Sequence, residues 1–344
     1  MSNHKPATLK QIALRAGVGT AAASVVLNGT RSTSRVSEAN RQAILRAADE
    51  LNYRPNVLAR SLRTRRTGII GYFSGYDCID PRNQYVAEVM SGLQAACINH
   101  GLDLLLYTPH ADLTAEKVVS SLCDGRLDGL IVTALPNHPI VPMLAEAHLP
   151  VVAIADPLEG IPSVVADSGE GGRMQARHLH DRGHRRVLYL PSDFPFPSVI
   201  DRQEGFYDEA AKLGIAVITG SPIHGHHPEL RTVENKAMSM PESEIQLLRG
   251  PDRCTAIQCW DDAPAYRIAS QLVRLGLNVP ADVAVMGYNG CTPTAELRWD
   301  LSTIRAPFRE IAALAVETLH LLIAGGEAPP VQSLPVTLVP GATT

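Results

Sequence analysis

Apolar strands and amphipathic helices alternate along residues 67–344, and this alternation constrains the fold more than any other feature. TGIIGYF at 67–73 and LDGLIVTAL at 127–135 have the composition of buried strands, and an amphipathic segment at 85–100 follows the first of them. Such alternation predicts an α/β fold with parallel sheets covered by helices on both faces. The pattern restarts after Asp167, which predicts two similar lobes with a ligand cleft between them, at the carboxyl ends of the strands.

The stretch TLKQIALRAGVGTAAASVVLN at 8–28 has a different pattern. Thr8 and Gln11 form a capping box at the start of a first short helix. Gly17 suits a left-handed helix end, and a second helix is expected from about 19 to 27. Two helices joined by a glycine-containing turn are the plan of a DNA-binding helix-turn-helix, and an ordinary helical hairpin is the alternative.

Positive charge is concentrated at the N-terminal end of the chain. Residues 1–66 hold twelve Lys and Arg against three Asp and Glu, a net charge of +9, which leaves −13 for the remainder of a chain whose total is −4. A basic segment on an acidic body indicates a polyanionic partner for that segment alone, and a solvated basic surface is the alternative. A third helix, capped by Ser37 and ending near Asn52, would complete a small three-helix head.

The segment YRPNVLARSLRTRR at 53–66 combines five arginines with apolar side chains. Pro55 suits the first turn of a helix, but so short a segment is too weak to be helical alone. A short basic helix that presents leucines suits a wedge in the DNA minor groove, where an apolar side chain unstacks a base step. A plain charged linker is the alternative.

TLKQIALRAGV, SVVLNG and RVSEANRQAILRAADELNYRPNVLARSLRTRRTGIIG together resemble the N-terminal signature of the lactose-repressor/galactose-repressor (LacI/GalR) family of bacterial transcription regulators. Looser landmarks such as Arg202–Phe206 resemble the same family's effector-binding core. The resemblance implies an α/β fold with a helix-turn-helix headpiece and a two-lobed, periplasmic-binding-protein-like core with parallel sheets. It implies these boundaries: headpiece 1–52, hinge helix or linker 53–66, core 67–344, lobe one about 67–165 and 295–323, and lobe two about 166–294 and 324–344.

The resemblance also implies which residues of the head and linker contact DNA. The family usually has Arg, the commonest reader of guanine, where this chain has Val25, so direct readout should be more apolar here. More of the specificity would then come from Thr20, from the loop at 30–35, or from DNA shape. The expected DNA-binding residues are Thr8, Thr20, Ala21, Ser24, Val25, Asn28, Arg35, Tyr53, Asn56, Ala59, Arg60 and Leu62.

For the cleft, Arg202 in the family motif R-x-x-G-F is the strongest candidate, because a guanidinium suits sugar hydroxyls or a carboxylate. The family's Asn-Asp pair after a lobe-two strand is matched here to Trp260 and Asp261, and the Asp of its glycine-aromatic-Asp motif to Asn289. These departures weaken the expected carboxylate grip on sugar hydroxyls. Core packing is the alternative role for each aromatic. The expected effector-binding residues are Tyr85, Ser198, Arg202, Trp260, Asp261, Asn289 and Phe308.

No pattern of enzyme chemistry stands out, since Walker, GxSxG and HExxH motifs are absent from the sequence. We expect no catalytic residues, no cofactor and no metal; the histidines at 224, 226 and 227 more simply form a solvated loop. The six cysteines are scattered without a CxxC pair, as in a reduced compartment. With neither a secretory signal nor the roughly 20 apolar residues of a membrane span, a cytoplasmic location is expected.

The function expected from the resemblance is a sequence-specific transcriptional regulator, most simply a repressor. Its partners would be a palindromic double-stranded DNA operator, a small-molecule effector related to sugars, and a second copy in a homodimer, with no membrane partner. A C-terminal leucine heptad that would join dimers into tetramers is absent from the sequence. The alternatives are a cytosolic small-molecule binding protein without DNA activity and an α/β enzyme.

Overall fold

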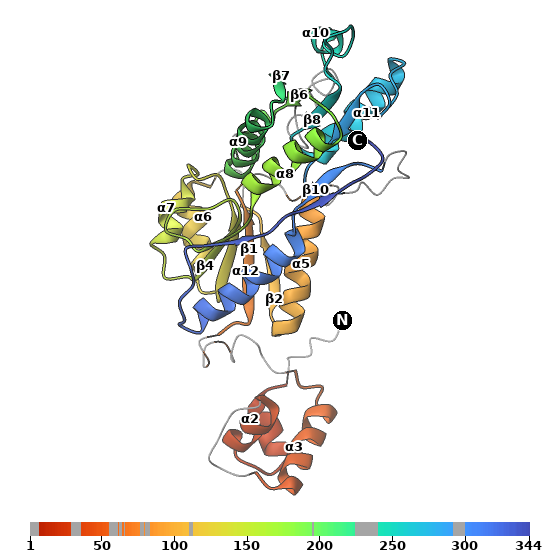
Figure 1. Ribbon diagram of the computed structural model, residues 1–344. Coiled ribbons are helices and arrows are strands. Elements are labelled where there is room, and N and C mark those ends of the chain that lie inside the picture. The colour runs from red at the N-terminus through yellow and green to blue at the C-terminus, as the bar shows by residue number, and fades with distance from the viewer. Residues whose placement is uncertain are drawn as a thin grey trace. The chain divides into compact units, whose positions relative to one another are not determined.

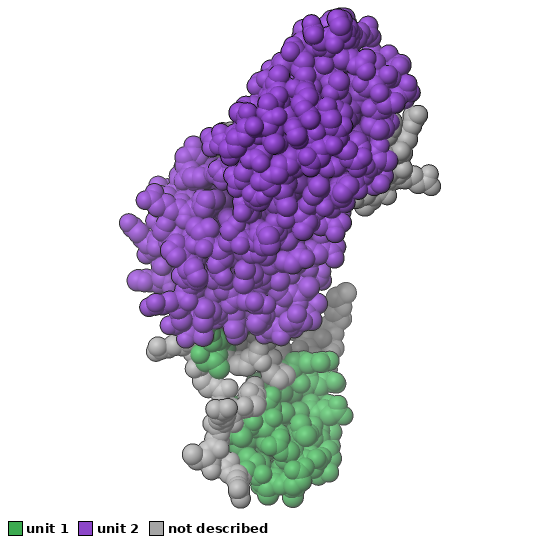
Figure 2. Space-filling view, in the orientation of Figure 1, with its two compact units in different colours: residues 1–68 green, residues 69–344 purple. Residues whose placement is uncertain are grey.

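The computed structural model describes residues 7–28, 36–54, 61, 64, 66–75, 79, 83–109, 113–194, 196–223, 240–291 and 300–344. The chain divides into two compact units, Met1–Gly68 and Ile69–Thr344, coloured separately in Figure 2. The expected linker helix at 53–66 and the histidine-containing loop at 224–227 lie largely or wholly outside the described residues. Among the helices that the structure describes, none has the length and apolar character needed to cross a membrane.

The smaller unit contains α1 (Leu9–Arg15), α2 (Thr20–Asn28) and α3 (Glu38–Glu50). The predicted capping box is present, because Thr8 and Gln11 exchange hydrogen bonds at the start of α1. Gly17 has φ of 68°, the left-handed conformation that ends α1 at no steric cost. The buried core of this unit is small and consists of Ile12, Ala13, Ala23, Ile44 and Ala47.

The first lobe of the larger unit is a six-stranded sheet of order β11-β5-β4-β3-β1-β2 in which every pairing is parallel. Both faces are covered, one by α5 and α12 and the other by α6 and α7 (Figure 1). The strands are β1 (Ile69–Ser74), β2 (Asp103–Tyr107), β3 (Gly129–Thr133), β4 (Val151–Ala155), β5 (Ser163–Ala166) and β11 (Val331–Leu334). The helices are α5 (Gln84–His100), α6 (Ala115–Leu122), α7 (Ile140–Ala145) and α12 (Phe308–Ile323).

The second lobe is a four-stranded parallel sheet of order β7-β6-β8-β9. Helices α8 and α9 cover one face, and α10 and α11 cover the other. The strands are β6 (Arg186–Leu190), β7 (Ala216–Thr219), β8 (Ala256–Cys259) and β9 (Ala284–Met286). The helices are α8 (Ser168–Asp181), α9 (Pro197–Lys212), α10 (Glu242–Gln246) and α11 (Asp262–Arg274).

The chain passes between the lobes in segments that differ from the expected assignment. Residues 295–323 were expected in lobe one, but β10 (Thr303–Arg305) is bridged to lobe two through Met286–Ser302 and Asn289–Arg305, and only α12 packs on lobe one. Residues 324–344 were expected in lobe two, but β11 extends the first-lobe sheet beside β5, and only β12 (Thr337–Val339) returns to pair with β10. Backbone pairing at a sheet edge decides these positions, and half-exposed strands carry little apolar signal.

Candidate functional site

Helix α2 presents one face of its surface outward from the head. Ala23 is fully buried against α1 and α3, whereas Thr20 and Ala21 are exposed and Ser24 and Val25 are half-buried. Residues at positions i, i+1, i+4 and i+5 share a helix face, so these four side chains form one surface. The N–H of Ala23 donates the first helical hydrogen bond of α2 to Gly19 O. Gly19 has no side chain with which to cap the helix.

The other expected DNA-binding residues of the head differ in what the structure shows of them. Thr8 uses its hydroxyl in the capping box of α1. Tyr53 is half-buried against the head core, and its N–H donates to Ala48 O at 2.8 Å, so it has a packing role. The other candidates lie outside the described residues: Arg35, Asn56, Ala59, Arg60 and Leu62. Asn28 is described as the last residue of α2, but its side chain is not.

Arg202 on α9 is the best-anchored polar side chain at the boundary between the two lobes of the core. It is only 5% exposed, its Nη1 donates to Trp260 O at 2.8 Å, and its Nε donates to Ser198 O at 3.3 Å. Its guanidinium carbon lies 3.7 Å from the centre of the Tyr288 ring, a cation–π contact. Arg202 therefore joins α9 to the carboxyl ends of β8 and β9.

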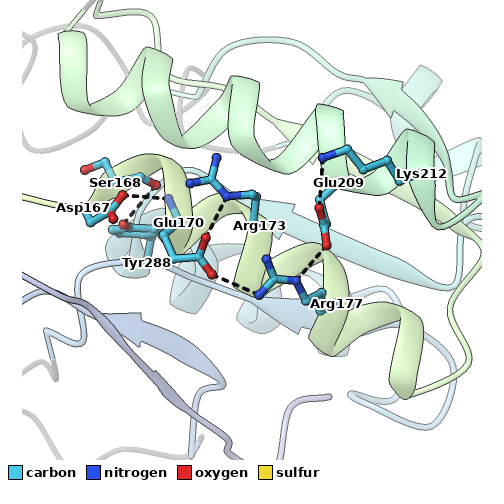
Figure 3. A network of polar contacts seen from close by, with 8 residues as sticks. All are labelled: Asp167, Ser168, Glu170, Arg173, Arg177, Glu209, Lys212 and Tyr288. Carbon is cyan, nitrogen blue, oxygen red and sulfur yellow. Dashed lines mark hydrogen bonds and ion pairs between the residues drawn. The ribbon is translucent and has the colours of Figure 1, made fainter.

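Close packing of α8 against α9 fixes the position of Arg202. A Cβ on Gly172 would lie 1.9 Å from Arg202 O, so only glycine permits this approach. Outward from the crossing, Glu170 pairs with Arg173 and Arg177, and Arg177 also pairs with Glu209, as Figure 3 shows. Partly exposed pairs of this kind add little stability singly. The Arg177–Glu209 pair joins α8 to α9, and the two pairs of Glu170 lie within α8.

A direct hydrogen bond joins the lobes. Asp156, which follows β4 of the first lobe, accepts a hydrogen bond from Ser198 N–H at the start of α9 in the second lobe, at 2.7 Å. Asp156 is 2% exposed. A carboxylate at a helix N-terminus is stabilised by the helix dipole as well as by the hydrogen bond.

Asp261, Asp262 and Asn289 form a polar cluster where β8 and β9 end, in which Asp262 and Asn289 are buried and Asp261 is half-buried. Asp261 caps α11 by accepting from Ala263 N–H at 2.8 Å, and it also accepts from the Asn289 side-chain amide. Asp262 accepts from Thr303 Oγ1 at 2.6 Å and from Cys291 N–H at 2.7 Å. Burial raises the pKa of Asp261, and burial together with the Asp261 charge raises the pKa of Asp262 well above its ordinary value.

The aromatic candidates divide between the two lobes. Tyr85 and Phe308 of the first lobe meet edge-to-face, with ring centres 4.8 Å apart. Burial raises the pKa of Tyr85 well above its ordinary value, and the charges of Tyr72, Asp156 and Cys291 raise it further. Trp260 is half-buried, and its indole N–H donates to Ile223 O at 2.8 Å.

The structure thus places these candidates where β8 and β9 end, in two hydrogen-bonded sets that meet at consecutive residues. Arg202 bonds to Ser198 and Trp260, and Asn289 bonds to Asp261. Sequence reasoning missed Asp156, Asp262 and Tyr288 as parts of this site. The signal that could have found Asp156 is its position directly after a strand, where ligands of parallel sheets are held. We call the whole set, with Tyr85 and Phe308, the inter-lobe site.

Comparisons with known proteins agree with this architecture. Residues 8–56 match the family described as bacterial regulatory proteins, lacI family, and residues 176–344 match the periplasmic binding protein-like domain. The HTH-type transcriptional repressor PurR of Photobacterium profundum is 31% identical over 318 residues, covering 91% of each chain. PurR of Proteus mirabilis is 30% identical over 320 residues, covering 91% of this chain and 89% of the relative.

Solved structures show the same fold. The lac repressor dimer bound to operator and the anti-inducer ONPF matches with a TM-score of 0.81 at 24% identity, covering 98% of this chain and 99% of that one. The transcriptional regulator CelR–cellobiose complex matches with a TM-score of 0.66 at 24% identity, covering 98% and 100%.

The chain therefore belongs to the lacI family of bacterial regulatory proteins. It is a DNA-binding transcriptional regulator with a periplasmic binding protein-like core, and not an enzyme. The expected family and fold class are confirmed.

Proposed function

We propose that this protein is a homodimeric repressor that binds a palindromic operator, and that a small molecule bound in the inter-lobe site controls its affinity for that operator. The observation that carries this proposal is the outward surface of α2, which packs through Ala23 and leaves Thr20 and Ala21 exposed for the major groove. The relatives named above are transcriptional repressors, and this chain aligns with about nine-tenths of their length. A regulator that acts on chromosomal DNA works in the cytoplasm.

In this proposal the headpiece spans 1–52, the hinge 53–66 and the core 67–344. Thr20, Ala21, Ser24 and Val25 lie in the major groove, and Leu62 enters the minor groove as the wedge. With Ala21 and Val25 in place of larger polar readers, apolar contacts and DNA deformation carry more of the specificity. Two heads related by a dimer axis would read two half-sites of a palindrome.

The inter-lobe site is the place at which an effector controls this activity. Buried polar side chains from both lobes meet there, and the direct bond between Asp156 and Ser198 makes the lobe arrangement sensitive to anything that enters. A ligand that favours one lobe arrangement shifts the spacing of the paired linkers, and so the stability of linker helices on DNA. Two structural neighbours are complexes with small molecules, cellobiose in one and ONPF in the other.

Fluorescence anisotropy on a duplex that the full-length protein has selected from random DNA tests the proposal. Replacing Leu62 by alanine should weaken binding at least about tenfold, and removal of residues 1–66 should abolish it. Leu275→Ala is the matched control, because it makes the same chemical change at a partly exposed position in the core. Binding that survives both Leu62→Ala and removal of residues 1–66 would sink the proposal.

A further inference from the structure

The N-terminus of α9 is a natural anion site, and in this protein a side chain of the first lobe already occupies it. α9 is a 16-residue helix that begins at Pro197, which has no N–H to offer. The N–H of Ser198 donates to Asp156 at 2.7 Å, and the N–H of Val199 turns back to Phe196 O at 3.0 Å. A phosphate or carboxylate approaching this helix would meet the Asp156 carboxylate instead of donors.

Arg202 of the inter-lobe site also has partners within the protein. A bidentate grip on an anion needs two guanidinium nitrogens, and Arg202 already donates from Nη1 to Trp260 O and from Nε to Ser198 O. Its flat face lies on the Tyr288 ring. Arg202 therefore serves to hold α9, β8 and β9 together, with Nε and Nη1 each bonded to a backbone carbonyl of the protein itself.

In the described part of the polar cluster formed by Asp261, Asp262 and Asn289, the buried side-chain atom without a hydrogen-bond partner is an acceptor. Asn289 is 9% exposed and its amide donates to Asp261, while its Oδ1 is buried with no hydrogen bond from the described residues. A buried carbonyl oxygen without a donor costs about 1–3 kcal/mol. A ligand that brings an O–H or N–H to this oxygen removes that cost, and one that brings another anionic oxygen to Asn289 and Asp261 does not.

We propose that the effector is an uncharged molecule rich in hydrogen-bond donors, such as a polyhydroxyl or N–H-bearing compound, and that Asp156 excludes phosphorylated and carboxylated ones by filling the anion position of α9. This inference rests on the inter-lobe site being the effector site. It goes beyond that function by stating the charge of the effector and the residue that selects it.

Trp260 provides a reporter at the site itself. The chain has two tryptophans, so Trp299→Phe leaves the Trp260 indole as the only one. Sulfate is titrated into this full-length protein at constant ionic strength, with chloride as the balancing anion, and Trp260 emission is followed. The parent should show no saturable response, and Asp156→Ala should bind sulfate at least about tenfold more tightly, because it vacates the helix N-terminus.

Asp181→Ala is the matched control, since it removes a carboxylate that is 78% exposed on α8. If Asp156→Ala does not fold, Asp156→Asn decides the question: it keeps an oxygen for Ser198 N–H but removes the charge, and its sulfate affinity should still exceed that of the parent. A saturable sulfate response in the parent, or the same affinity in parent and Asp156 variants, would overturn the inference.

Charge-matched metabolite pairs then test the effector class with the same reporter. Ribose is compared with ribose 5-phosphate, and glucose with glucose 6-phosphate and gluconate. Any compound that binds at Trp260 should be the uncharged member of its set, and a phosphorylated or carboxylated binder would overturn the inference. Operator binding is measured separately on the same protein, so loss of DNA binding counts against the proposed function and not against the charge of the effector.

Discussion

Asn289 shows how a single residue at the inter-lobe site is constrained by backbone and side chain together. Its φ of 103° is a conformation that few residues other than glycine and asparagine adopt. Its N–H donates to Ile304 O at 2.8 Å, which ties the end of β9 to the crossing segment. Its side-chain amide donates a hydrogen bond to Asp261, whose carboxylate lies near that of Asp262. The amide is required here because a third buried carboxylate would have no donor.

Asn289→Asp should therefore destabilise the core by about 2 kcal/mol at pH 8. It replaces a donor to Asp261 with a second carboxylate, and burial already raises the pKa of Asp261. Because the folded-state pKa of the new pair is raised, the folded protein binds more protons than the unfolded chain, and the deficit should shrink as the pH falls toward 4. Urea unfolding of the full-length protein at pH 8 and pH 5 measures both effects.

The exchanged double variant, Asp261→Asn with Asn289→Asp, is the control for that experiment. It restores one amide and one carboxylate with their positions reversed, so most of the lost stability should return. A double variant no more stable than Asn289→Asp would show that the hydrogen bond is not what the two side chains contribute.

Two histidines of the second lobe predict sensitivity to acid. His178 Nε2 bonds to Thr344 Oγ1 at 2.7 Å, and His184 Nδ1 bonds to Thr255 Oγ1 at 2.9 Å. Burial lowers the pKa of both imidazoles, so the unfolded chain takes up protons at a higher pH than the folded one. Stability is complete above the unfolded pKa of about 6.5 and should decline as the pH falls below it.

Replacing His178 by Gln and His184 by Asn keeps a polar atom near each bonded nitrogen and removes the charge. The midpoint of thermal unfolding in this double variant should vary less between pH 7 and pH 5 than in the parent. An unchanged slope would exclude these two histidines as its source.

The close crossing of helices α8 and α9 determines where Arg202 lies. Gly172→Ala should lower the free energy of unfolding by about 3 kcal/mol, because the new methyl group would lie 1.9 Å from Arg202 O. Gly169→Ala on the same helix is the matched control: its nearest neighbour would be Arg173 Nη1 at 3.6 Å, and stability should stay equal or rise by up to about 1 kcal/mol. Equal losses in both variants, measured by urea unfolding, would contradict close packing as the cause.

The elements themselves could largely be predicted from periodicity, as strongly apolar strands such as β3 and amphipathic helices such as α5 show. Both lie within a residue or two of the segments expected at 127–135 and 85–100. β5 and β11 could not be predicted, because they are four residues long and their pairing is made by the backbone. Their side chains give too short a pattern to separate a strand from a loop.

Sequence reasoning named residues that the structure places near one another, but it could not predict their contacts. The motif that contains Arg202 pointed to the first turns of α9, but it says nothing of Trp260 O, which accepts a hydrogen bond from Arg202 Nη1. Asp156 is separated from Ser198 by 42 residues, and only the fold brings the two together. Long-range contacts between lobes leave no periodic signal in a sequence.

At the scale of the whole molecule, a basic head and an acidic two-lobed core are combined in one chain, with net charges of +9 for residues 1–66 and −13 for the rest. The positive charge is placed where a polyanion is bound, and the acidic core is repelled from the same polyanion. The operator affinity of the full-length protein should therefore fall steeply with salt, whereas binding of an uncharged effector to the core should respond little. Parallel titrations at about 50 and about 200 mM salt compare the two, and equal salt dependence would contradict this division of labour.

In the proposed function, the head reads a specific DNA sequence as part of a two-fold dimer. The most direct measurement is selection from a library of random duplex DNA by the full-length protein, followed by sequencing of the bound fraction. We expect enrichment of one motif with two-fold symmetry, and no enrichment by a chain that lacks residues 1–66. An absence of any enriched motif with the full-length protein, or the same motif enriched without residues 1–66, would contradict it.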